Sequence, residues 1–289
     1  MNQLNLPPLP AGLTGPRTRM PALPPGTPQL LRQLTRPDVS FRELARSLER
    51  FPAIAARLIG LANSAWSSPA VTITSLEAAC TRMGFDVVRS VSLGLAVGTP
   101  FDPRNCPAFD AEQFWCSALM VADTAADLKQ ASGDWCALDA LSVRSAGLLH
   151  NLGLLWLAER MPKATDQAIQ AANADEDLSL NQAMIEHCGI GYRQAGGHLA
   201  SQWHLPEVMV SSIVFHGDTS YLGEHAKAAC LTGIANDMVT TLCAGDTWIA
   251  AGADLGAIPL NDDSIREIAQ RTAARLEATR QLARSVFAA

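Results

Sequence analysis

An all-α fold is predicted by three features of this 289-residue sequence: its composition, its helix-capping residues and the spacing of its apolar residues. Alanine and leucine dominate and aromatic residues make up only 6%, which favours helices over strands. Apolar residues recur every three or four positions, and no segment shows the alternation typical of a strand. We therefore expect helices packed on helices, in one large domain or two small lobes.

The N-terminal segment is predicted to be an extended arm. Residues 1–28 contain eight of the seventeen prolines, and proline lacks the amide donor that a helix needs. Its leucine and methionine side chains are expected to lie on the second half of the protein. A partly ordered tail without a function is the simpler interpretation.

Capping signals define the helices of the first half. Ser40 with Glu43, and Thr74 with Glu77, have the spacing of a capping box, and Pro52 is suited to a first helical turn. Gly84 fits a helix end. The apolar stripes that follow are Leu44, Leu48 and Phe51; Ile54, Leu58 and Leu61; and Val87, Val88, Val91 and Leu95.

The second half is predicted to contain longer helices after a loop at residues 100–107. One continuous helix is expected to carry His150 and Asn151 in its middle. The expected helical segments are 110–128, 138–160, 179–187, 192–204, 206–217 and a buried stretch at 223–244.

From Asp263 onward the sequence predicts an amphipathic helix. Its apolar stripe is Ile265, Ile268, Thr272, Leu276 and Val286, and its basic residues are Arg266, Arg271, Arg275, Arg280 and Arg284. Packing on the body with a solvated basic face is the expected arrangement. A helix that docks a partner is the alternative.

Charge and cysteine usage limit the classes of function. A net charge of −6 argues against broad binding to nucleic acid, which needs a basic surface. The seven scattered cysteines lack Cys-x-x-Cys spacing, which is typical of reduced thiols in a cytosol. No signal peptide and no membrane span are expected. The helix pair at residues 74–95 faintly imitates a DNA-binding motif, but helix packing explains it better.

Ordered short motifs over residues 20–239 show that the chain resembles the HDOD output domain, a bacterial relative of the HD phosphohydrolases. Phe51 departs from the pattern, because the family usually has an acid there. The matching segments are Leu23-Pro24-Pro25, 52–58, 61–65, 73–79, Met83-Gly84-Phe85, Phe114-Trp115, 146–153 and Trp203-His204-Leu205-Pro206 leading to His216.

The resemblance implies a two-lobed helical domain whose second lobe is a degenerate HD core. We expect an arm at 1–19 and an HDOD domain at 20–245, with lobes at about 20–108 and 109–245. A linker and the amphipathic helix would occupy 246–289.

The resemblance also locates a degenerate HD site. An active HD site uses a His-Asp pair, further histidines and a late aspartate, whereas this sequence has His150-Asn151 at the pair. The corresponding positions are Ser117, His150, Asn151, Tyr192, His216 and Asn236. Two neutral imidazoles hold a catalytic metal poorly, and no anionic ligand remains to bridge two cations.

These features predict a pseudo-enzyme with no catalytic residue, bound metal or cofactor. The expected role is that of a cytoplasmic bacterial regulator that binds protein partners of a signalling pathway. The alternatives are a residual metal-dependent phosphohydrolase or phosphodiesterase, and a module that senses a nucleotide or another small ligand. The remaining polar residues are expected to pin helices together, with a ligand pocket as the other interpretation.

Overall fold

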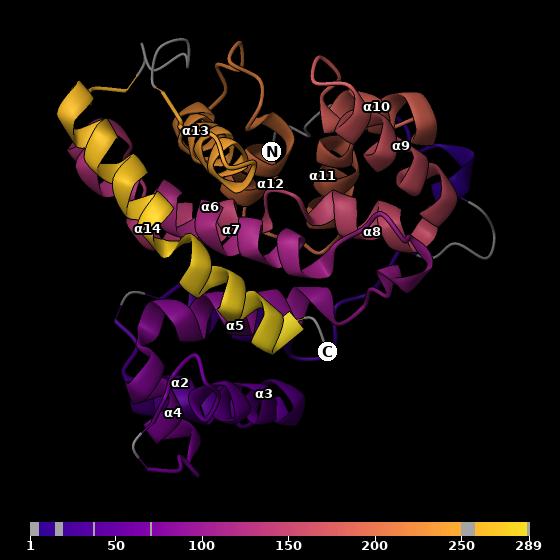
Figure 1. The fold of residues 1–289 in the computed structure, drawn as a ribbon. Coiled ribbons are helices and arrows are strands. Elements are labelled where there is room, and N and C mark those ends of the chain that lie inside the picture. The colour runs from indigo at the N-terminus through magenta and orange to yellow at the C-terminus, as the bar shows by residue number, and fades with distance from the viewer. Residues whose placement is uncertain (1–5, 15–19, 37, 70, 250–257, 288–289) are drawn as a thin grey trace.

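A computed structural model describes residues 6–14, 20–36, 38–69, 71–249 and 258–287. These residues form α-helices and short 3-10 turns without any strand, so the predicted fold class is confirmed (Figure 1). No helix in these ranges is both long and apolar enough to cross a lipid bilayer.

The described residues of the first lobe form five α-helices. Helices α2, α3 and α4 lie together at one end of the molecule, and α5 lies between them and the second lobe (Figure 1). The bounds are α1 Thr27–Leu34, α2 Phe41–Leu48, α3 Pro52–Ala62, α4 Leu76–Met83 and α5 Phe85–Gly98.

The second lobe is built around α6 and α7, with further helices on both sides (Figure 1). The bounds are α6 Ala111–Ala131, α7 Ala140–Leu149, α8 Leu152–Arg160, α9 Pro162–Ala174, α10 Leu180–Cys188, α11 Tyr192–Gln202, α12 Glu207–Phe215, α13 Ala226–Cys243 and the C-terminal α14 Asp262–Phe287. The 3-10 turns are η1 Ala11–Leu13, η2 Pro103–Asn105 and η3 Gly133–Trp135.

Local side-chain hydrogen bonds explain where several helices begin. The Ser40–Glu43 capping box is complete: the amide of Glu43 donates to the Ser40 hydroxyl, and the amide of Ser40 donates to the Glu43 carboxylate. Asp110, Asp139 and Ser179 accept hydrogen bonds from the first turns of α6, α7 and α10. Each such cap satisfies a backbone N–H that the helix leaves without a partner.

Two expected boundaries in the first lobe are wrong. Ser75, not Thr74, caps α4, because its hydroxyl accepts from the amide of Ala78. Phe51 lies outside α2 and precedes Pro52 at the start of α3. Helix α1 was not expected, because prolines surround it, but Pro28 stands in its first turn, where proline is tolerated.

The predicted helix at 138–160 is also wrong, because the chain turns at His150-Asn151 and divides it into α7 and α8. In an unbroken helix, the Gly147 carbonyl would accept from the amide of Asn151. Here that carbonyl accepts from the His150 ring nitrogen Nδ1 at 2.7 Å. A side chain inserted into the backbone ladder is a recognised cause of a helix break.

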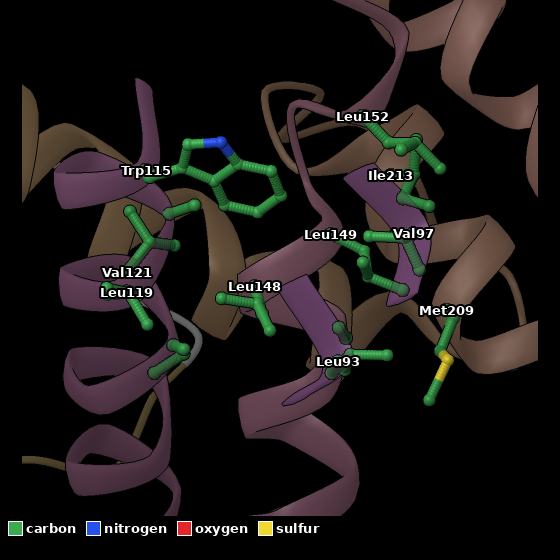
Figure 2. Packing of buried hydrophobic residues seen from close by; sticks show 14 of the residues in the cluster. Leu93, Val97, Trp115, Leu119, Val121, Leu148, Leu149, Leu152, Met209 and Ile213 are labelled. Atoms are coloured by element: carbon green, nitrogen blue, oxygen red, sulfur yellow. The ribbon is translucent and has the colours of Figure 1, made fainter. Parts of the chain in front are cut away.

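The core is continuous between the two lobes. In Figure 2, Leu93 and Val97 of α5 lie among side chains of α6, α7, α8 and α12, including Leu149 and Ile213. Arg144 of α7 forms an ion pair with Asp123 of α6 and another with Asp86 of α5. Helix α5 is therefore buried where a DNA-reading helix would have to be exposed.

The N-terminal arm packs on the second lobe, as expected for its described part. Leu13 is buried, and the backbone carbonyl of Pro7 contacts His198 Nε2 at 2.7 Å. The indole of Trp203 donates to the carbonyl of Pro21 at 2.7 Å. Residues 1–5 and 15–19 of the predicted arm lie outside the described residues.

The C-terminal helix α14 packs along α6 and reaches α3 in the first lobe. Its predicted stripe is confirmed, because Ile265, Ile268, Thr272 and Val286 are buried and Leu276 is partly buried against the core. The ring of Phe287 stacks on Trp115 with centroids 4.2 Å apart. Part of the predicted linker, residues 250–257, lies outside the described residues.

We expect Phe287→Ala to lower the free energy of unfolding by about 1–2 kcal/mol, because it removes partly buried area and an aromatic pair. Urea denaturation followed by circular dichroism measures the change. Glu267→Ala on the exposed face of the same helix is the control and should change the stability by less than about 0.5 kcal/mol. Equal effects of the two variants would contradict the stacking described here.

Candidate functional site

The candidate site is centred on two buried imidazoles. His150 lies in the turn between α7 and α8, and His216 directly follows α12. Their ring centroids are 5.3 Å apart in an edge-to-face arrangement. The structure thus brings together two histidines that are distant in sequence.

Both rings are oriented by backbone carbonyls. His150 Nδ1 donates to Gly147 at 2.7 Å, and His216 Nδ1 contacts the carbonyls of Ser212 and Ile213 at 3.1 and 3.0 Å. Because Nδ1 must carry the proton in each contact, Nε2 is the nitrogen with the free lone pair in the neutral ring. Metal-binding histidines are oriented in the same way.

Two further predicted residues join this pair. Tyr192, the first residue of α11, has its hydroxyl 3.5 Å from His216 Nε2, which is a long contact. The side chain of Asn236 on α13 hydrogen-bonds the His150 ring. We call this set of four residues the polar centre: His150, Tyr192, His216 and Asn236. It connects the α7–α8 turn, α11, the end of α12 and α13.

The other two predicted residues are less closely integrated. Asn151 is only 8% exposed, and its carbonyl Oδ1 finds no hydrogen-bond donor among the described residues. Ser117 is half-buried in α6 and takes no part in the contacts that join the histidines, Tyr192 and Asn236. An unsatisfied buried polar atom costs about 1–3 kcal/mol, so Asn151 is an unfavourable residue in this position.

Arg193 is a component of the site that the motif analysis missed. Its guanidinium lies 5.8 Å from the centroid of the Tyr192 ring. It also occupies the space beside Gly217, where an added Cβ would be 2.0 Å from Nη1. The sequence signal was its position next to Tyr192, but a basic residue belongs to no HD ligand position.

Burial keeps both histidines neutral. Loss of hydration lowers the pKa of His150 to about 4, and the positive charge of Arg193 acts in the same direction. The pKa of His216 lies well below its usual range, first because of burial and then because of His150 and Arg193. Among the described residues, no carboxylate contributes to the shift at either imidazole.

A dinuclear metal centre of the HD type does not fit these residues. The described parts of the chain contain no group of three or more His, Cys, Asp or Glu side chains placed to hold a metal ion. Two imidazoles are fewer than the three protein ligands typical of catalytic zinc. Arg193 acts on both imidazoles, and its positive charge also repels a divalent cation.

The site depends on a very close approach of two helices. An added Cβ at Gly153 of α8 would lie 1.9 Å from the carbonyl oxygen of Tyr192 and 2.3 Å from the amide nitrogen of Gly196. Only glycine permits this distance between α8 and α11. The crossing fixes Tyr192 relative to the turn that carries His150.

Two other groups of side chains lie apart from this centre. His187 is exposed, while its neighbour Cys188 is buried with its sulfur 3.7 Å from Thr165 Oγ1. Arg89, the basic residue of the helix pair at 74–95, is buried and donates to the carbonyl of Arg36 at 2.6 Å. Neither arrangement forms a metal site or a basic reading surface.

Comparison with solved structures establishes the fold. A candidate signal transduction protein from Marinobacter aquaeolei VT8 has a TM-score of 0.81 at 22% identity, over 92% of this chain and 60% of that one. An HDOD domain protein of unknown function from Geobacter sulfurreducens gives 0.71 at 21%, over 93% and 94% of the two chains. A candidate phosphohydrolase from Shewanella amazonensis SB2B gives 0.68 at 20%, over 92% and 94%.

Sequence comparison gives the family. An uncharacterized protein from Treponema pallidum is 26% identical over 236 residues, which are 79% of this chain and 43% of that protein. This chain thus spans less than half of that relative. The sequence model of the HDOD domain matches residues 20–219, which include His150, Asn151, Tyr192 and His216. The chain therefore belongs to the HDOD domain family.

Proposed function

We propose that this protein is a non-catalytic regulatory module of bacterial signalling, located in the cytoplasm, that acts by binding other proteins. The observation that carries the proposal is the electrostatics of the polar centre. Two neutral imidazoles, Asn151 and Asn236 stand beside the cation of Arg193, and no carboxylate in the described part of the chain acts on either ring. This set supplies hydrogen bonds between helices but lacks the anionic ligands that hold two cations for hydrolysis.

In this proposal, the polar centre sets how the helices of the second lobe pack. His150, Tyr192, His216 and Asn236 come from four different places in the chain, and their contacts hold these places together. A buried polar network favours one arrangement over alternatives, because any other packing leaves its members unsatisfied. In this proposal, the residues at the degenerate HD positions therefore fix the surface that is presented to partners.

We expect the purified protein to retain fewer than one transition metal per chain and to show no manganese-dependent hydrolysis of bis(p-nitrophenyl) phosphate. Plasma mass spectrometry and a colorimetric assay measure these quantities. His150→Ala should change neither, and the exposed His187→Ala is the matched control. Two tightly held metals per chain, or hydrolysis abolished by His150→Ala alone, would overturn the proposal in favour of a residual phosphohydrolase.

The second candidate function is anion sensing, and the state of the Arg193 side chain favours it. Its Nε atom is buried without a hydrogen-bond partner among the described residues, and a guanidinium is well suited to phosphate. Calorimetric titration with cyclic and linear nucleotides tests this role. Nucleotide binding without turnover would support anion sensing if the Arg193→Gln variant loses that binding. The absence of nucleotide binding by the wild-type protein would rule it out.

A further inference from the structure

A large groove of about 1230 Å³ lies along α13 and adjoins the polar centre at His216. Its walls come from α13, the segment 217–225 between α12 and α13, the segment 134–138 after α6, and Trp248. Helices α12 and α13 lie side by side in Figure 1. His216 and Gly217 also line the groove, so an occupant would lie next to the histidine pair.

The walls are held in place by specific contacts. Phe215 stacks on Tyr221 with centroids 3.9 Å apart. The indole of Trp248 donates to Asp237 Oδ2 at 2.8 Å, and Lys227 Nζ donates to the carbonyl of Trp135 at 2.6 Å. The groove is thus preformed, which reduces the entropy that binding must overcome.

The rim exposes large apolar side chains. Leu222 is 91% exposed and Ile249 is 70% exposed, and both line the groove. Only two other large apolar side chains are exposed in the described part of the chain, Val71 and Ile185. Apolar side chains that gather around a concave surface indicate a binding site, whereas scattered ones do not.

The charge of the groove is negative. Asp134 and Glu224 are exposed on its rim, and neither takes part in an ion pair among the described residues. Lys227 is the one lysine or arginine in the lining, and its ammonium already contacts the Trp135 ring and carbonyl. A cationic occupant is therefore favoured electrostatically over an anionic one.

The size and chemistry of the groove select the kind of occupant. Its volume exceeds the range of about 300–1,000 Å³ typical of small-molecule pockets. The described residues offer no strand edge to pair with an extended peptide, so a partner segment must satisfy its own backbone, as a helix does. The chain's own basic helix, α14, is already packed along α6.

We infer that this groove binds a basic amphipathic helix of a partner protein, with apolar side chains against Leu222 and Ile249 and basic ones near Asp134 and Glu224. This inference rests on the proposed regulatory function and assigns its contact surface. The mode is that of a helix in a groove, which uses apolar anchors at helical spacing.

The test uses a labelled 14-residue peptide of leucine and lysine, with the leucines at helical spacing, and a matched peptide with glutamate in place of lysine. Fluorescence anisotropy measures both affinities for the full chain. We expect the lysine peptide to bind at least tenfold more tightly than the glutamate peptide. Leu222→Asp should weaken it at least tenfold, whereas Val71→Asp, a substitution at another highly exposed apolar residue in the first lobe, should leave it unchanged.

A charge reversal provides the second arm. The double variant Asp134→Lys/Glu224→Lys should bring the ratio of the two affinities close to one. Equal binding of both peptides by the wild-type protein, or equal effects of Leu222→Asp and Val71→Asp, would overturn the inference. A dimer in sedimentation experiments that Leu222→Asp dissociates would also overturn it, by making the groove an interface between copies of the chain.

The experiments distinguish failure of the groove inference from failure of the proposed regulatory function. Retained metals and hydrolysis would remove the regulatory function whatever the peptides do. A metal-free, inactive protein with no preference for the lysine peptide would overturn only the inference that the groove binds a basic helix.

Discussion

Replacing Gly153 with alanine is expected to lower the free energy of unfolding by about 3 kcal/mol or more. The new methyl group would lie 1.9 Å from the carbonyl oxygen of Tyr192 and 2.3 Å from the amide nitrogen of Gly196. Overpacking usually costs about 1–3 kcal/mol, and more when the neighbours cannot move. Both neighbours here are backbone atoms of α11, so relief requires the two helices to separate.

Urea denaturation at neutral pH measures this change, with Gly60→Ala as the matched control. Gly60 lies inside α3, and an added Cβ there has no neighbour within 4 Å. Alanine should stabilise that helix by about 0.5–1 kcal/mol, because glycine loses more backbone freedom on folding. A Gly153→Ala protein as stable as the wild type would show that α8 and α11 do not cross as closely as described.

Acidification from pH 6.5 to pH 4 is expected to remove roughly 3 kcal/mol of stability through His150 alone. Its pKa is lowered from 6.5 to about 4 by burial, so the unfolded chain binds more protons than the folded one across this interval. The contribution is fully present above pH 6.5 and is lost as the pH falls toward 4. The depressed pKa of His216 acts in the same direction.

The measurement is the free energy of unfolding at several pH values between 4 and 7.5. The double variant His150→Gln/His216→Gln should lose markedly less stability across this interval than the wild type, even if it starts lower. The exposed His187→Gln should lose as much as the wild type does. An unchanged pH slope in the double variant would contradict the neutral, buried state of the two rings.

Local signals made much of the fold predictable. The Ser40–Glu43 box and the caps at Asp110 and Ser179 lie within a few residues of the amides they satisfy. The stripe of α14 is visible because it alternates with charged residues at helical spacing. These elements depend on interactions between near neighbours, which the sequence displays directly.

Other elements depend on packing that the sequence does not display. The sequence does not predict helix α9, because its buried residues, Thr165 and Ala168, are small and leave no strong apolar stripe. The break between α7 and α8 depends on the His150 ring reaching the Gly147 carbonyl. Helix propensity contains no term for that competition between a side chain and the backbone.

The site was predictable only through family motifs. His150 and His216 belong to different helices, and nothing in their spacing places their rings 5.3 Å apart. The sequence does not point to Arg193, because its role arises from proximity in space to Gly217 and the two imidazoles. That proximity exists only after α11 and α12 have packed.

Helix α14 has a mechanical consequence for the whole molecule. Its last turn touches both lobes, because the carbonyl of Val286 accepts from Arg57 of α3 at 3.1 Å while Phe287 stacks on Trp115 of α6. Rotation of one lobe against the other would have to break one of these attachments. A signal that changes the angle between the lobes must therefore release the end of α14 from α3 or from α6.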